Sequence, residues 1–253
     1  MSLTQKDFND NAKPEKKSDG KSGTDGDKRA SYLTIGMHVM KVEENRKYRV
    51  HQIMHPIATS QYSPTRSVFV KGKNLRKGRY VIVPTTFDPG FQGDFMLRVH
   101  SSEQIDVREL KEHKPKDGLC SCCTRPICCV TRLKLVEGVL LEDRKGNRAT
   151  DPYCIVKCEG HKVQTDYVSG SSSPKFDLEY IFYRRKMELP IEIELWDSNY
   201  GRDSFLGRVS QPAPIDNENR SIECPLKGQN QNDDPMAGCL KIELASYDDP
   251  IYL

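Results

Sequence analysis

Eight short runs of alternating or apolar residues, separated by turn-forming residues, most constrain what this chain can fold into. In chain order they are VTRLKLVEG, DPYCIVKCEG, HKVQTDYV, FDLEYIFYRR, PIEIELWD, FLGRVS, SIECPL and GCLKIELAS. Successive side chains of a strand point to opposite faces, and regularly spaced turn signals are typical of an all-β sandwich. Residues 130–253 are therefore predicted to form a complete two-sheet antiparallel sandwich.

The clearest of these runs is PIEIELW, which fixes the orientation of its strand. Ile191, Ile193 and Leu195 alternate with Glu192 and Glu194. We expect the three apolar side chains to face the core and the two glutamates to face water.

KIEL, near the end of the chain, repeats the same alternation. There Ile242 and Leu244 are predicted to point inward. Cys154 and Cys158 lie four residues apart in another run and are predicted to share one face of their strand.

An earlier stretch also consists of strand-like runs, but it is shorter. LTIGMHVMKVE, SVFVKG, RYVIVPTTF and DFMLRVH are rich in Val, Ile, Phe and Tyr and are separated by Gly or Pro. A self-sufficient sandwich usually takes about 100 residues. This stretch, residues 32–109, is therefore predicted to be a partial sandwich whose sheet needs a partner.

Composition separates these two β regions from two polar segments. Residues 1–31 are rich in Lys, Asp, Gly and Ser and are predicted to be a disordered leader. Residues 110–129 form a linker that is rich in Cys, Pro and Gly. The predicted domains are thus 1–31, 32–109, 110–129 and 130–253.

Charge is distributed unevenly although the whole chain carries only +3. Residues 1–31 carry about +1, residues 32–118 about +6 and residues 119–253 about −4. Opposite signs suit one region that docks acidic partners and another that gathers cations, although ordinary solvated surfaces give the same split. We expect no nucleic-acid partner.

Nine cysteines occur without an apolar leader and without a run of 18 apolar residues. They are therefore interpreted as reduced thiols of a cytoplasmic protein. Five of them lie in the linker: Cys120, Cys122, Cys123, Cys128 and Cys129. Zinc binding, reversible palmitoylation and plain reduced thiols are the alternatives there, and the paired spacing of a structural zinc site is missing.

Two acidic loops could carry metal chemistry. LLEDRKGNRATDPY offers Asp143 and Asp151, and LWDSNYGRDSFLG offers Asp197, Asn199 and Asp203. Calcium takes six to eight oxygen ligands from carboxylates, carbonyls and water, and two loops at one end of a sandwich can supply them. The alternative is that these aspartates serve ordinary turns.

Basic residues on or beside the strands of the second region are candidates for contact with anionic lipid headgroups. They are Lys157, His161, Lys162, Arg184, Arg185 and Lys186. The alternative is that such side chains discourage pairing between exposed strand edges.

From Val130 to about Ser246, the order of EG, the Asp loop, DPY, KCEG, SSSPKF and ELWD…FLG resembles the C2 domain family. The resemblance implies weak calcium binding by Asp143, Asp151, Asp197 and residues of the later loop. Asn199 stands where that family places an acid. The loop is one residue short, so Ser204 competes with Asp203 for the last ligand position.

The runs GRYVIVPTTF and GDFMLRV resemble the calpain-type β-sandwich, and its combination with a C2 domain resembles the calpain-5-like group. The resemblance implies an all-β regulatory region of a calcium-dependent cysteine endopeptidase. That region would dock calcium, anionic membrane lipids or protein partners at a membrane periphery. The Cys–His–Asn protease core would lie in cis outside this chain, which has no catalytic residues of its own. A stand-alone C2-type adaptor is the alternative.

Overall fold

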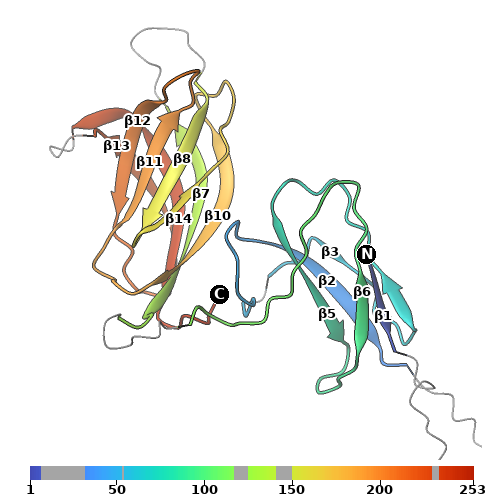
Figure 1. Ribbon diagram of the computed structural model, residues 1–253. Helices are drawn as coiled ribbons and strands as arrows, with labels where there is room; N and C mark the ends of the chain where they lie inside the picture. The colour runs from blue at the N-terminus through green and yellow to red at the C-terminus, as the bar shows by residue number, and fades with distance from the viewer. Residues whose placement is uncertain (7–31, 53, 117–124, 141–149, 230–233) are drawn as a thin grey trace, which may run out of the picture. The chain divides into compact units, whose positions relative to one another are not determined.

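The computed structural model describes residues 1–6, 32–52, 54–116, 125–140, 150–229 and 234–253, and its regular elements there are all strands (Figure 1). The chain divides into two compact units. Unit 1 comprises residues 1–42 and 54–108, and unit 2 comprises residues 43–53 and 109–253. The predicted all-β class is confirmed.

Unit 1 consists of two antiparallel three-stranded sheets, ordered β4-β1-β6 and β3-β2-β5. Their strands are β1 Ser2–Gln5, β2 Ile35–Val42, β3 Ala58–Thr59, β4 Ser67–Phe69, β5 Arg79–Thr86 and β6 Phe95–Arg98. A small core joins the two sheets: it contains Leu3 and Val68 from the first and Met37 and Val39 from the second.

Strand β1 differs from the predicted polar leader, because residues 2–5 lie inside unit 1. Leu3 pairs with Val68 of β4 and Leu97 of β6, and it is 2% exposed. The prediction that the sheet of this region lacks a partner was therefore wrong. The partner sheet was missed because its strands are only three or four residues long and pair across more than 60 positions of sequence.

Other parts of the two predicted polar segments lie outside the described residues. They are residues 7–31 of the leader and residues 117–124 of the linker, which include Cys120, Cys122 and Cys123.

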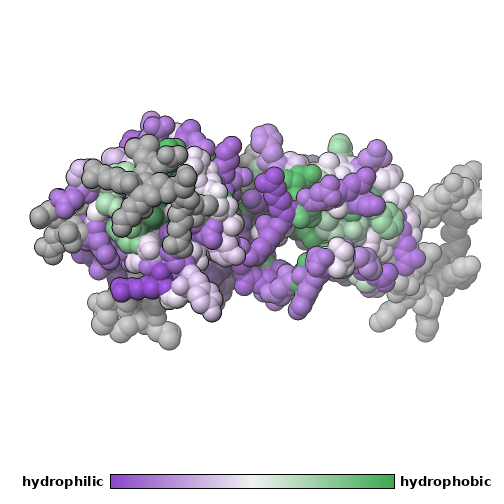
Figure 2. Space-filling view, turned by 90° about the horizontal axis from the view of Figure 1, so that it is seen from above, coloured by the Kyte–Doolittle hydropathy of each residue, from purple (hydrophilic) through white to green (hydrophobic). Residues whose placement is uncertain are grey.

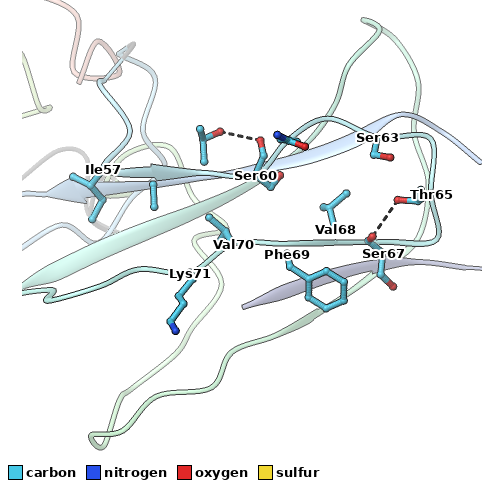
Figure 3. Close-up of a pocket in the computed structure, with 12 residues that line it drawn as sticks. Ile57, Ser60, Ser63, Thr65, Ser67, Val68, Phe69, Val70 and Lys71 are labelled. Atoms are coloured by element: carbon cyan, nitrogen blue, oxygen red, sulfur yellow. Dashed lines mark hydrogen bonds between the residues drawn. The ribbon is translucent and has the colours of Figure 1, made fainter.

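Unit 1 nevertheless remains open between its sheets. A cavity of about 600 Å³ lies along β3 and β4, the outermost strands of the two sheets on that side. Val68, Phe69 and Val70 line it together with Ser60 and Lys71 (Figure 3). Figure 2 shows hydrophobic residues at the surface of unit 1.

Unit 2 contains an eight-stranded antiparallel arrangement with the order β10-β7-β14-β13-β12-β11-β8-β9. Its strands are β7 Cys129–Val139, β8 Pro152–Cys158, β9 His161–Gln164, β10 Lys175–Arg184, β11 Ile191–Asp197, β12 Ser204–Gln211, β13 Asn219–Lys227 and β14 Pro235–Tyr247. Strands β12 and β13 meet only at Arg208 and Lys227, so the arrangement folds there into two four-stranded layers. The predicted complete sandwich is confirmed.

The core of unit 2 lies between these layers and agrees with the predicted alternation. Ile191, Ile193 and Leu195 of β11 are at most 1% exposed. Cys154 and Cys158 of β8 are buried in the same cluster, as their spacing predicts. Burial raises the pKa of both thiols, that of Cys158 to about 11, which keeps them protonated and unreactive near neutral pH.

Candidate calcium-binding loops

The pairing of β8 with β11 places two of the predicted ligands side by side at one end of unit 2. Pro152 is opposite Asp197 in the register, so Asp151 lies just beyond the strand end. The Asp151 amide donates a hydrogen bond to Asp197 Oδ1 at 2.7 Å, and the Ser198 amide donates to the Asp151 carbonyl at 3.0 Å. The two carboxylates are therefore fixed by strand ends and not by long flexible loops.

A third segment, between β9 and β10, joins the same end. Asp151 Oδ1 accepts hydrogen bonds from the Gly170 amide at 2.7 Å and from Ser169 Oγ at 3.0 Å. The Ser171 amide donates to the Thr150 carbonyl at 2.9 Å. Asp151 thus organises this neighbouring loop, a role that its position in the sequence did not indicate.

Asn199 lies against Asp197, as the predicted ligand set requires. Its Nδ2 donates to Asp197 Oδ2 at 3.2 Å and to Ser204 Oγ at 3.2 Å. The amide oxygen is a neutral donor for a metal, so the pair carries one negative charge where two acids would carry two.

Asp203 is held by the protein on both of its oxygens. Tyr153 Oη donates to Oδ2 at 2.7 Å, and the Asn199 amide donates to Oδ1 at 3.0 Å. These two bonds hold the pKa of Asp203 below its usual value. Burial, followed by the bond to this carboxylate, raises the pKa of Tyr153 to about 12. Asp203 therefore stabilises the loop through both of its oxygens, each of which keeps a further lone pair.

The donor chemistry of this end fits calcium in kind, because Asp151, Asp197 and Asn199 all offer hard oxygens. Among the described residues, no three Asp, Glu, His or Cys side chains gather closely enough to hold a metal by themselves. Asp143, the remaining predicted ligand, lies outside the described residues. Backbone carbonyls, water or a bound headgroup would have to complete the coordination.

Two exposed tyrosines lie on the loops at this end of unit 2. Tyr200 is fully exposed between Asn199 and Gly201, and Tyr167, on the loop after β9, is 59% exposed. At the base of the Tyr200 loop, Trp196 and Phe205 pack edge to face with ring centroids 5.3 Å apart. Neither tyrosine was among the site residues predicted from the sequence. An aromatic residue inside the polar, Gly-containing run SNYGRD was the signal that could have found Tyr200.

The predicted basic set separates into exposed and buried members. His161 and Lys162 are exposed on β9, and Lys162 lies opposite Lys157, which pairs with Glu194 of β11. Charge from Lys157 is thus partly neutralised within the protein.

Arg184 does not belong to a surface set, which corrects its prediction as a lipid contact. Its side chain is 0% exposed and donates hydrogen bonds to the carbonyls of Ala213 at 2.7 Å and Leu189 at 2.6 Å. It was mistaken for a surface residue because it begins the run RRK, whose other members, Arg185 and Lys186, are more exposed. The amides of these two residues donate to the Glu159 carboxylate.

Comparisons with known proteins agree with this architecture. Residues 2–100 match the family model of calpain large subunit domain III, and residues 129–225 match that of the C2 domain. Calpain-5 of Caenorhabditis elegans is 40% identical over 228 residues, which cover 89% of this chain and 34% of that protein. Calpain-5 of Rattus norvegicus is 40% identical over 186 residues, covering 73% and 28%. A C2 domain of plant extended synaptotagmin 1 aligns with a TM-score of 0.43 and 19% identity, covering 49% of this chain and 98% of that one.

The matched domains define a β-sandwich region of the calpain type, a domain III followed by a C2 domain. The chain belongs to the calpain family, with calpain-5-like relatives, and spans about a third of the length of the curated relatives it matches. The match of domain III begins at residue 2, which agrees with the place of β1 in unit 1.

Proposed function

We propose that this chain is the regulatory docking region of a calpain-5-like cysteine endopeptidase, and that the loop end of unit 2 binds anionic membrane lipid together with calcium. The observation that carries this proposal is the contact of Asp151 with Asp197 beside the exposed Tyr200. Carboxylates at the loop end would gather the cation, and an aromatic side chain at the tip suits the interface between water and lipid.

Asp151, Asp197 and Asn199 would hold calcium, with Asp143 as a further ligand from the first loop. Bound calcium supplies positive charge at the loop end and open coordination positions for phosphate oxygens. Since Asn199 replaces an acid and Asp203 is engaged with Tyr153, we expect weak affinity. The protein's own contribution is to fix the two carboxylates before the metal arrives.

The exposed basic residues would add attraction to an anionic surface. His161, Lys162 and Lys186 are the exposed members of the predicted set, whereas Arg185 and Lys157 are half-exposed. Each basic residue near an anionic membrane contributes about 1 kcal/mol. In the described part of the chain, no helix is long and apolar enough to cross a membrane. We propose a cytoplasmic protein that binds membranes peripherally.

The protease core that this region would position in cis is part of the same proposal. Because the chain spans about a third of its relatives, proteolysis, substrates and protein partners belong to a longer protein of this family. We expect this chain alone to leave casein intact in the presence of calcium. Inhibitor-sensitive cleavage by the purified chain would contradict that expectation.

Vesicle co-sedimentation of the full chain tests the proposal directly. Vesicles of phosphatidylcholine with and without phosphatidylserine are compared in calcium and in chelator. We expect calcium to increase binding to the anionic vesicles, and Asp197→Asn to remove that increase. Asp177→Asn, an exposed carboxylate on β10, is the matched control and should leave the increase intact. Equal binding by wild type and Asp197→Asn would reject the calcium role of these loops.

A second variant separates lipid from calcium. Tyr200→Ser should weaken vesicle binding, because the side chain lies at the loop tip. Calcium binding, measured by calorimetry, should be unchanged. The stand-alone adaptor gives the same vesicle result. It is distinguished by a transcript that encodes no Cys–His–Asn core upstream of residue 1.

A further inference from the structure

Residues 43–52 lie between two strands of unit 1 and yet belong to unit 2. The chain leaves unit 1 after β2, packs within unit 2 and returns to unit 1 at Met54. It enters unit 2 again at Glu109. We call residues 43–52 the strap. Domain boundaries drawn from sequence assign it to the wrong unit, because its covalent neighbours are strands of unit 1.

The strap covers the outer edge of β10. In the strand order this edge strand pairs only with β7, which leaves one row of its backbone groups to be satisfied elsewhere. The Glu44 amide donates to the Glu179 carbonyl at 2.8 Å. The Asn45 side chain then accepts from the Ile181 amide at 2.8 Å and donates to the Ile181 carbonyl at 2.7 Å. Asn45 thus imitates the backbone of an added strand.

The strap also contacts a second apolar cluster, which is separate from the main core. Val130, Ile181, Ala245, Tyr247 and Leu253 are at most 6% exposed and form this cluster. The neighbours of Ile181 on β10, at positions 180 and 182, face the main core, so the cluster lies on the opposite face of its sheet. An outer face of an antiparallel sheet usually meets water, and here it is covered.

Tyrosines join the strap to this outer face. Tyr48 packs edge to face on Tyr183 of β10, with ring centroids 5.1 Å apart and planes at 80°. This geometry is the preferred one for aromatic pairs. Burial raises the pKa of Tyr183 to about 12, which agrees with a ring enclosed by the strap.

A buried ion pair fixes the centre of the strap. Arg46 is 1% exposed and makes two bonds of 2.8 Å to the two carboxylate oxygens of Glu43. Its remaining nitrogen Nη1 donates to the Leu253 carbonyl at 3.0 Å. Burying two charges costs several kcal/mol each unless the pair is well placed and its other donors are satisfied. An ordinary surface loop has no need of such a pair.

The end of the strap is held by a second segment of unit 2. Arg49 donates from its amide to the Glu112 carbonyl at 2.9 Å and from Nε to the Leu110 carbonyl at 3.0 Å. His51 Nε2 and His113 Nδ1 lie 2.9 Å apart. The contacts therefore run along the whole strap and involve three segments that are distant in sequence.

We propose that the β10 edge and the adjoining outer face form a strand-addition docking surface of the C2-type unit, and that its occupant is the strap of the same chain. Edge pairing, an aromatic anchor and a bidentate charge pair act together, as in the binding of an extended peptide to a sheet edge. The C2-type unit is consequently completed by residues from within the calpain domain III sequence. Release of the strap exposes the edge to other extended segments.

Hydrogen exchange on the full chain tests this proposal. Asn45→Ala removes both bonds to Ile181. We expect the Ile181 amide to exchange at least about tenfold faster in this variant. Lys47→Ala is the matched control, because this neighbouring side chain is exposed and should leave exchange unchanged. The amide of Ile193 in β11 reports on global unfolding and should exchange equally in all three proteins. Unchanged exchange at Ile181 in Asn45→Ala would overturn the proposal.

A peptide of residues 43–52 tests occupancy of the surface separately. Labelled peptide should bind the full-length double variant Asn45→Ala/Tyr48→Ala at least about tenfold more tightly than wild type, because the wild-type surface is already filled. A scrambled peptide of the same composition should bind neither protein. Equal binding of both peptides, or no binding to the variant, would show that the surface does not select the strap.

Discussion

The two units are both built from two antiparallel sheets, but they bury very different numbers of apolar residues between those sheets. Unit 2 buries 18 residues in one cluster between two four-stranded layers, whereas the cluster of unit 1 contains six buried residues between two three-stranded sheets. Unit 1 also leaves large aromatic side chains in water, with Phe69 at 71% and Phe87 at 63% exposure. Because burial of apolar surface supplies most of the stability of a small domain, we expect unit 1 to have the smaller free energy of unfolding.

This contrast explains why the same kind of strand behaves differently in the two halves. Strand β11 pairs on both sides and buries every second residue, while β4 and β6 contribute one inward residue each to the small core. The strap adds to the contrast. Its residues lie between strands of unit 1 in the sequence, yet they pack within unit 2.

The largest effect that could sharpen this contrast is expected from Arg46→Ala. The substitution leaves the Glu43 carboxylate buried without its partner, which typically costs about 3–5 kcal/mol. We expect unit 2 to lose that stability although the residue is covalently flanked by unit 1. Urea unfolding followed by fluorescence reports on unit 2, because the one tryptophan of the chain, Trp196, lies there.

Two controls make the Arg46 result specific. The double variant Glu43→Gln/Arg46→Met removes both charges and should recover part of the loss. Lys47→Ala alters an exposed neighbour and should have no effect. A loss confined to the circular dichroism of unit 1, with the Trp196 transition unchanged, would mean that the strap supports the other unit.

The next largest effects come from matched core truncations in the two units. Ile193 in unit 2 and Met37 in unit 1 are both at most 1% exposed, and each substitution by Ala costs about 2–5 kcal/mol. We expect Ile193→Ala to shift the Trp196 transition to lower urea and leave unit 2 folded. Met37→Ala should abolish the transition of unit 1, which is followed by far-UV circular dichroism. If both units stay folded after their truncation, the proposed difference in stability between them is contradicted.

Much of unit 2 could be predicted from sequence because its information is local. The alternation in PIEIELW and KIEL states directly which side chains face the core, and Ile193 and Ile242 are buried accordingly. The adjacency of Asp151 and Asp197 followed from strand ends at one end of a sandwich. These features require only the period of a strand and the antiparallel pairing of neighbours.

The features that were missed depend on distant partners. Strand β1 has one apolar side chain, Leu3, and its identity as a strand comes from Val68 and Leu97. Arg184 resembles a surface residue by its neighbours, and its burial follows from carbonyl groups of a later turn and of residue 213. Nothing in the sequence around Asn45 indicates that its partner lies 136 residues away.

A smaller effect is expected at the loop end of unit 2 from Tyr153→Phe. The bond from the Tyr153 hydroxyl is the first cause of the lowered pKa of Asp203, so its removal should bring that pKa back toward the usual range. A carboxylate with a lowered pKa in the folded state adds stability above its unfolded pKa and loses it as the pH falls. The variant should therefore show a weaker loss of stability as the pH falls through the acidic range where aspartates titrate, below about pH 5. Carboxyl chemical shifts followed by NMR during titration measure the pKa.

The same variant also tests whether Asp203 stabilises the loop while Asp197 binds calcium. Freed from Tyr153, Asp203 could turn toward Asp197, and weak calcium binding should then strengthen in Tyr153→Phe. Tyr167→Phe, which alters an exposed tyrosine of the neighbouring loop, is the control and should change neither property. An unchanged Asp203 pKa in Tyr153→Phe would show that the hydrogen bond does not tune this group.

The smallest effect is expected from the histidine pair at the end of the strap. Burial, then His113, Arg46 and Arg49, lower the pKa of His51, while Asp249 opposes them. A histidine whose pKa is lowered on folding binds its proton more weakly in the folded than in the unfolded state. Stability is then complete above the unfolded pKa of about 6.5 and is lost as the pH falls below it. We expect unit 2 to lose slightly more stability from about pH 7.5 to about pH 5.5 in wild type than in His51→Gln.

The comparison of His51→Gln with His55→Gln locates this effect in unit 2. His55 is an exposed histidine of unit 1, only four residues further along the chain, so its substitution should leave the pH dependence of the Trp196 transition unchanged. Because His51 itself is exposed, solvent screens its interactions and keeps the difference small. If both variants reduce the pH dependence of the Trp196 transition equally, the effect does not come specifically from His51. The assignment of the end of the strap to unit 2 would then lack support from this experiment.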